Sequence, residues 1–333
     1  MLNIYFFMEY LVSLDKENHS SVDSVSSITK PYEIYSLYNV IVVLLCGVLI
    51  LTGFLSSTDN PMVENSMIKG NLDDGTIYYF PGHLSIAMSS FRALSYIGIP
   101  VLTGLSHEPH VIWWIVGPCF FLLLDRYRGK SLITVLLVIA FLLLSILSTS
   151  FTAVVVFVVT LLMEFLYTAF LNKKKAFYIP VFFVGIIVFL YVLSKNDFIV
   201  DALSLMFDEK TSEGVDEGSL GYSVSGLSYM ISPKSLLGWG NVTDIGWGFD
   251  LKGANIGFIT FALDMVLFVM LYVKSLKLFL CRDNHIHYIG MACVYFLFHS
   301  LKMGTQVFTF PYFAFFIVII SFTTQLINNK KVV

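Results

Sequence analysis

Two adjacent side chains, His107 and Glu108, have the residue types for acid–base chemistry. They stand immediately before Pro109, a residue suited to the first turn of a helix. Imidazole and carboxylate groups serve proteins as general bases, so this pair could accept the proton of a reacting hydroxyl. The structural alternative is a helix cap, because the charge of Glu108 favours the positive end of the helix dipole.

Arg92 is the residue best suited to binding a phosphate. It is one of only four arginines, and the other three lie in short basic segments. A guanidinium group matches phosphate in a bidentate way, whereas lysines such as Lys210 and Lys234 act as point charges. The alternative is that Arg92 only extends its charged end to lipid headgroups.

Two tryptophans, Trp239 and Trp247, lie in a stretch that holds six glycines between Gly238 and Gly257. Glycine allows backbone turns that other residues avoid, and aromatic faces beside such turns suit stacking on sugar rings. Tyr222, earlier in the same segment, is a third candidate for sugar contact. The alternative is a loop that tryptophan anchors at a membrane interface.

Further polar groups interrupt apolar segments. Asp264 lies near the middle of one such segment, and His299 and Lys302 lie at the end of another. Ionisable groups are costly in lipid and usually face a bundle interior or a partner. Five hydroxyl residues within Ser145–Thr152 separate two apolar runs, and we favour a tight turn over a polar cavity lining there.

The composition restricts the class of protein to which the chain can belong. Hydrophobic residues make up 57% of the 333 and charged residues 13%, against roughly 25% charged in soluble domains. This excludes a soluble enzyme, a disordered chain and a nucleic-acid binder, and leaves a polytopic membrane protein. Because there is no CxxC motif, no Cys/His cluster and no phosphate-binding glycine motif, we expect neither a metal nor a nucleotide cofactor.

Eight apolar segments approach the length of about 20 residues that crosses a bilayer. We therefore predict an all-α polytopic membrane protein with about eight transmembrane helices, and nine or ten as the alternative. Leu84–Gly104 is also apolar, but a crossing there would invert the later charge bias, so we keep it external or re-entrant. The predicted spans are Tyr38–Leu55, Val111–Leu124, Ser131–Leu147, Ala153–Leu171, Phe177–Leu193, Ile256–Val273, Ile286–Leu301 and Val307–Leu326.

Basic residues alternate between the segments that join these spans. Short segments on one side hold 13 of the 20, which makes that side, with both chain ends, cytoplasmic. We predict a cytoplasmic or interfacial N-terminal segment over residues 1–35, a transmembrane bundle over 36–328, and two large outer loops over 56–110 and 194–255. Trp113 and Trp114 then lie at the outer end of their helix, where aromatic belts occur. The short apolar stretch Leu2–Leu14 is an interfacial segment or the remnant of a helix.

The order of these motifs resembles the O-antigen polymerase and ligase superfamily, on its polymerase (Wzy-like) branch. The similarity covers most of Arg92–Leu326. Its most specific parts are a Glu-Pro element that opens a helix and a Ser-Pro element followed by Gly-x-Gly. The motifs run in the order Arg92, Gly104 with Glu108 and Pro109, Ser145–Thr152, Met230–Gly240, and Gly253–Phe258.

The resemblance implies a glycosyltransferase of the bacterial inner membrane. Such a polymerase transfers a glycan from undecaprenyl diphosphate onto the next lipid-linked repeat unit at the periplasmic face, in O-antigen, capsule or exopolysaccharide synthesis. Outer cations stabilise the leaving diphosphate, and a base activates the acceptor hydroxyl. Its partners would be the lipid-linked oligosaccharide, membrane lipids and, in the same pathway, a chain-length regulator and a flippase, but not nucleic acid.

Two departures from the family pattern narrow this expectation. No arginine occurs in Asp216–Tyr229, so Lys210 or Lys234 would have to assist Arg92. The ligase branch usually has a histidine just before the helix that follows the second outer loop, and here that position reads Ala254-Asn255, which argues against a ligase. The main alternative is a lipid-linked oligosaccharide flippase or other export transporter. A membrane acyltransferase centred on His285 or His287 is a more remote one.

Overall fold

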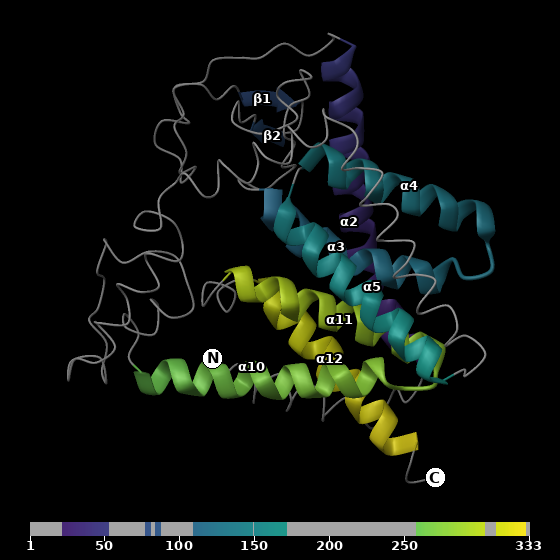
Figure 1. Ribbon diagram of the computed structural model, residues 1–333, viewed down its shortest axis with the longest axis vertical. Coiled ribbons are helices and arrows are strands. Elements are labelled where there is room, and N and C mark those ends of the chain that lie inside the picture. Colours follow the sequence, from purple (N-terminus) through teal and green to yellow (C-terminus); the bar gives the residue numbers. More distant parts are fainter. Residues whose placement is uncertain are drawn as a thin grey trace, which may run out of the picture. The chain divides into compact units, whose positions relative to one another are not determined.

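The chain forms mainly helices in the part that the structure describes (Figure 1). A computed structural model describes residues 22–52, 77–80, 84–87, 109–148, 150–171, 258–303 and 311–330. The expectation of a helical protein is confirmed for these ranges. Their seven helices are α2 (Val22–Leu51), α3 (Pro109–Arg126), α4 (Ser131–Ser148), α5 (Phe151–Leu171), α10 (Phe258–Phe279), α11 (Asn284–Met303) and α12 (Pro311–Lys330).

A small β-hairpin departs from the all-α prediction. Strand β1 (Ile77–Phe80) pairs antiparallel with β2 (Leu84–Ala87), and Ile77 lies opposite Ala87. Aromatic and β-branched residues, such as Tyr78 and Ile86, favour a pleated strand. The hairpin lies in the first predicted outer loop, and β2 takes up the first residues of the competing segment Leu84–Gly104.

Seven of the eight predicted apolar segments coincide with helices, and the eighth, Phe177–Leu193, lies outside the described residues. The largest difference is in α2, which begins at Val22 rather than at the predicted Tyr38. Its first half carries Thr29 and Glu33, which lower the local hydropathy. Both side chains are buried, so they face the interior of the fold and do not interrupt the helix.

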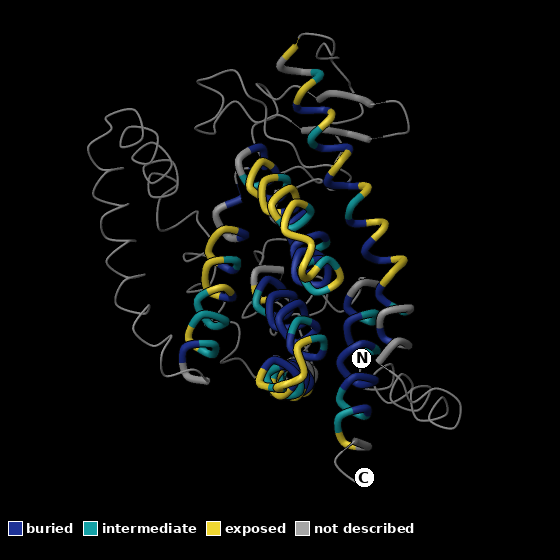
Figure 2. Tube along the Cα trace, turned by 90° about the vertical axis from the view of Figure 1, so that its right-hand side faces the viewer, coloured by how far each residue is buried: buried dark blue, intermediate teal, exposed yellow. Residues whose placement is uncertain are grey.

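Several helices expose apolar side chains along one side. In α2 these residues recur every three or four positions, from Ile34 to Val48, which is the repeat of one helix face. α4, α5 and α10 have similar exposed residues, and Figure 2 shows them beside the buried ones. Soluble proteins rarely expose extended apolar surfaces, so these faces favour association with a membrane.

Among the residues that the structure describes, length and composition single out one helix as able to cross a membrane. Its apolar window is Ile28–Leu49, within α2. Ser131–Ser145, Ala153–Ala169 and Phe313–Asn328 are apolar but shorter. In the described ranges the helices therefore support a membrane protein, while eight separate crossings remain a prediction.

The chain divides into two compact units, which we describe separately. In the described part, the first unit contains the start of α2, the end of α3, and α10, α11 and α12. Its centre is α11, whose residues from Met291 to Leu297 are all buried. The Phe296 ring stacks on Phe316 of α12 with centroids 4.0 Å apart, which holds these two helices together.

The second unit contains the rest of α2 and α3, with α4, α5 and the hairpin. Its core is a cluster of aromatic rings: Phe120 of α3 contacts Phe141 of α4 and Phe157 of α5. Trp113 contacts the same two rings. Trp113 and Trp114 are 3% and 0% exposed, so both indoles are buried and do not form an exposed aromatic belt.

Candidate functional site

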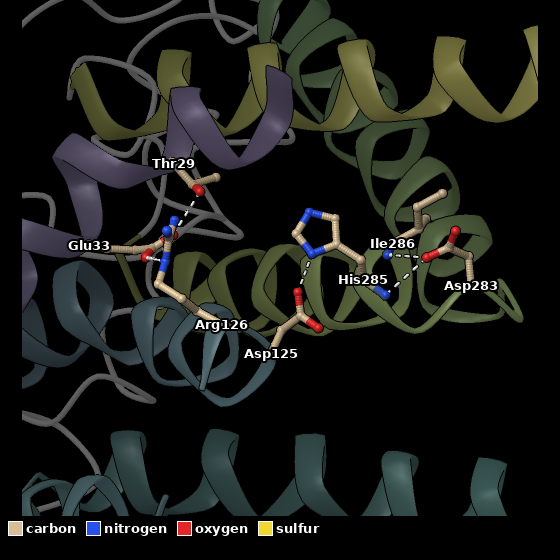
Figure 3. Close-up of polar contacts among 7 residues, drawn as sticks. All are labelled: Thr29, Glu33, Asp125, Arg126, Asp283, His285 and Ile286. Atoms are coloured by element: carbon tan, nitrogen blue, oxygen red, sulfur yellow. Dashed lines mark hydrogen bonds and ion pairs between the residues drawn. The ribbon is translucent and has the colours of Figure 1, made fainter. Parts of the chain in front are cut away.

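Charged side chains from three helices meet in the first unit (Figure 3). They lie at the C-terminal end of α3, in the first half of α2 and at the N-terminal end of α11. We call Glu33, Asp125, Arg126, Asp283 and His285 the charged cluster. Its members come from segments far apart in the sequence, so the tertiary structure brings them together.

The first pair in the charged cluster joins α2 to α3. Arg126 donates to both carboxylate oxygens of Glu33, through Nε to Oε2 and through Nη2 to Oε1, the latter at 3.0 Å. Thr29 Oγ1, one helical turn earlier in α2, donates to Oε1 at 2.7 Å. Glu33 is 5% exposed, and a carboxylate in that position needs these partners to offset its lost hydration.

The second pair joins α3 to α11. His285 Nδ1 is hydrogen-bonded to Asp125 Oδ2, and the side chains are 31% and 12% exposed. The hydrogen bond with Asp125 raises the pKa of the His285 imidazole, and burial partly opposes the rise. Protonated His285 and Asp125 therefore form an ion pair.

Asp283 caps the start of α11. Its Oδ1 accepts a hydrogen bond from the backbone N–H of His285 at 3.0 Å, and one from Ile286 at 3.3 Å. Aspartate at this position satisfies amides that have no partner within the helix, and its charge favours the positive end of the dipole. The cap fixes the backbone from which His285 extends toward Asp125.

Two features hold the start of α11, which carries His285 of the charged cluster, against the end of α10. His287 Nδ1 is hydrogen-bonded to the backbone carbonyl of Phe279, the last residue of α10. At Gly290 the two backbones approach so closely that a Cβ atom would lie 2.6 Å from the carbonyl carbon of Leu278. The start of α11 is thus fixed against α10, which limits where His285 can lie.

Chemically, the charged cluster pairs an imidazole with a carboxylate beside a second, arginine-based ion pair. It can hold or release a proton at His285. Three or more His, Cys, Asp or Glu side chains placed for a metal ion do not occur within the described ranges.

Sequence reasoning missed three members of this cluster, Glu33, Asp125 and Asp283. It placed Arg126 among the inner basic residues and His285 in the remote acyltransferase alternative. The available signal was that Asp125 ends an apolar segment and Glu33 precedes one, since a carboxylate in such a position is expected to have a partner.

Most of the predicted site residues lie outside the described part of the chain. Of the remaining three, His299 is fully buried in α11, with its ring 5.8 Å from that of Tyr295. Lys302 belongs to the last turn of α11, and Asp264 to α10. The residues outside the described part are Arg92, His107, Glu108, Lys210, Tyr222, Lys234, Trp239 and Trp247.

The hydroxyl-rich segment Ser145–Thr152 has structural contacts. The indole Nε1 of Trp113 donates to Ser148 Oγ at 2.6 Å, and Ser148 is fully buried. Ser150 Oγ accepts from the backbone N–H of Ala153 at 3.3 Å, which caps α5. These contacts support the favoured role as a tight turn between α4 and α5.

No family model, no curated protein and no solved structure matches this chain. A proposal for its function therefore rests on the residues, their order and the geometry of the described helices.

Proposed function

We propose that the chain is a bacterial inner-membrane polymerase of lipid-linked glycan repeat units. It would transfer the glycan from undecaprenyl diphosphate onto the next lipid-linked unit at the periplasmic face. The support comes from the motif order in the sequence, from the apolar faces of the helices, and from the position of α3 between two groups of polar residues.

The observation that carries the proposal is the extent of α3. It begins at Pro109, directly after His107 and Glu108, and ends at Asp125 and Arg126. Its 18 residues give a length of about 27 Å, close to the ~30 Å of a bilayer's hydrocarbon core. In this proposal α3 crosses the membrane with Arg126 on the cytoplasmic side, which would bring Glu108 to the periplasmic side, where this substrate is used.

The same orientation fits the other helices of the first unit. The ion pairs place the N-terminal end of α11 and the first half of α2 beside the C-terminal end of α3. These ends adjoin basic residues such as Lys30, Arg128 and Arg282, which the charge bias assigns to the cytoplasm. Both chain ends are then cytoplasmic, and residues 56–110 and 194–255 are the two outer loops of a bundle with eight spans.

In this proposal the acceptor hydroxyl loses its proton to Glu108 or His107 and attacks the anomeric carbon of the donor glycan. The bond from that carbon to the diphosphate oxygen breaks, and undecaprenyl diphosphate leaves. Cations are needed because negative charge develops on the leaving group. Arg92, with Lys210 or Lys234, would supply them.

Other residues would bind the substrate around this centre. Trp239, Trp247 and Tyr222 would contact sugar rings. His299 and Lys302, at the end of α11 away from His285, would face the same side of the membrane. Asp264 would lie within the bundle.

The test replaces Arg92 in cells that make a normal amount of the protein. We expect Arg92→Ala to abolish or strongly shorten the polymer and Arg92→Lys to retain part of it, because lysine keeps the charge but not the bidentate geometry. Arg282→Gln, an exposed position on the other side, is the matched control and should leave the polymer unchanged. Normal polymer length and amount in Arg92→Ala would rule out the proposed role.

A flippase is the alternative, and a deletion strain distinguishes the two. Loss of a polymerase leaves single lipid-linked repeats on the periplasmic side, whereas loss of a flippase leaves them on the cytoplasmic side. Transporters generally place charged groups near the membrane midplane. Here most candidate residues lie in the two predicted outer loops, which favours chemistry at one surface.

A further inference from the structure

His285 and Asp125 join two helices at a point where several charged side chains lie close together. In the charged cluster, three carboxylates, Glu33, Asp125 and Asp283, accompany one permanent cation, Arg126. Arg126 donates two hydrogen bonds to Glu33, and its charge also acts on His285. Protonation of His285 adds the second positive charge beside the carboxylates.

We infer that the Asp125–His285 pair is a pH-sensitive latch that fastens the N-terminal end of α11 to the C-terminal end of α3. The latch is closed when His285 carries its proton. It loosens when the imidazole becomes neutral, because a hydrogen bond between two opposite charges is then replaced by one in which only Asp125 is charged. This inference concerns regulation and does not depend on which reaction the protein performs.

The groups around the imidazole act on its pKa in opposite directions, and the hydrogen bond with Asp125 has the largest effect, which raises the pKa. Asp125 hydrogen-bonds Nδ1, and Asp283 lies two residues away at the cap of α11; both favour the protonated ring. Arg126, next to Asp125 on α3, opposes protonation. Nε2 is shielded from solvent and, among the described residues, has no hydrogen-bond partner, so placing a proton there has a desolvation cost.

The latch joins the end of α3 to the start of α11, and other contacts also hold these two helices. α3 and α11 also meet where the Phe121 and Tyr295 rings lie 5.7 Å apart. At its start, α11 is fastened to α10 through His287 and the carbonyl of Phe279. Opening the pair therefore frees the end of α3 relative to α11 and leaves the helix hairpin intact.

The sign of the pH dependence follows from the raised pKa of His285. Its contribution to stability is fully present below its unfolded pKa, about 6.5, and is lost as the pH rises through the higher folded value. The contact is therefore strongest in mildly acidic conditions and weakens as the pH rises above the folded pKa of His285.

The experiment measures the thermal midpoint Tm of the full-length protein in lipid nanodiscs across the range from mildly acidic to mildly alkaline pH. We expect the wild-type Tm to fall by about 2–4 °C more across this range than that of His285→Asn or Asp125→Asn. Arg282→Gln, exposed and one position before Asp283, is the control and should keep the wild-type slope. Equal slopes in the wild type and both latch variants would overturn the inference.

A second measurement follows the proton directly and needs only folded protein. NMR titration of the wild-type imidazoles, with the His285 signal assigned by its absence in His285→Asn, should give a pKa above about 6.5. Asp125→Asn should lower that pKa, because the charged partner is lost. A wild-type His285 pKa at or below the ordinary value, or one that Asp125→Asn leaves unchanged, would also overturn the latch.

Discussion

At the scale of single residues, the Glu33–Arg126 pair shows how the protein tolerates a carboxylate inside an apolar helix. Glu33 is almost completely buried, while Arg126 retains 30% of its side-chain surface. Removing Arg126 and removing Glu33 should therefore change the stability of the protein by different amounts. A guanidinium at that exposure can turn toward water, but the buried carboxylate cannot.

This asymmetry gives the first prediction. Arg126→Gln should lower the free energy of unfolding by about 2–4 kcal/mol, and Glu33→Gln by less, because only the former leaves an uncompensated buried charge. Reversible unfolding in mixed micelles, followed by circular dichroism, measures both values.

Lys277→Gln serves as the control, since this exposed lysine lies on α10 outside the charged cluster. Its unfolding free energy should match the wild type. If Arg126→Gln and Glu33→Gln lowered the free energy of unfolding equally, Glu33 would not be shielded from water as the structure indicates.

At the scale of helices, α10 and α11 approach each other closely at Gly290. The side-chain hydrogen of Gly290 leaves room for the backbone of Phe279 and Leu278, and an added Cβ would be 2.5 Å from the Phe279 Cα. Backbone atoms cannot rotate away as a long side chain can, so the helices would have to separate.

The second prediction follows from this approach. Gly290→Ala should destabilise the protein by about 2 kcal/mol or more, although alanine is intrinsically the better helix former. Unfolding in mixed micelles measures the change. Leu301→Ala, at an exposed position of the same helix, is the control and should cost less. A neutral or stabilising Gly290→Ala would contradict the described packing.

At the scale of the whole molecule, the proposed orientation assigns each end of α3 to a different aqueous compartment. The third prediction tests this with single cysteines in a variant whose four native cysteines are replaced. A membrane-impermeant maleimide should label Lys69→Cys in intact cells. It should label Lys130→Cys only after the membrane is permeabilised.

A membrane-permeant maleimide is the control for this experiment, because it should label both cysteines in intact cells. Labelling of Lys130→Cys by the impermeant reagent in intact cells would reverse the orientation of α3. It would also remove the argument that Glu108 lies on the periplasmic side.

The sequence by itself determined the helical segments well. Long apolar runs bounded by charged or helix-starting residues, such as Pro109 and Arg126, coincide with α3. Hydropathy failed at α2, because Thr29 and Glu33 look like loop residues until a partner is known. It also missed the β-hairpin, whose strands are only four residues each.

Only the tertiary structure decided which charges meet. Asp125 and His285 are separated by 160 positions and Glu33 and Arg126 by 93, and no local pattern links such distant residues. Whether a stretch of chain forms a helix depends on its own composition and periodicity, and both can be read from the sequence. Which charged side chains form ion pairs depends on how several helices pack against one another. The partner of a buried charge can be identified only when that packing is known.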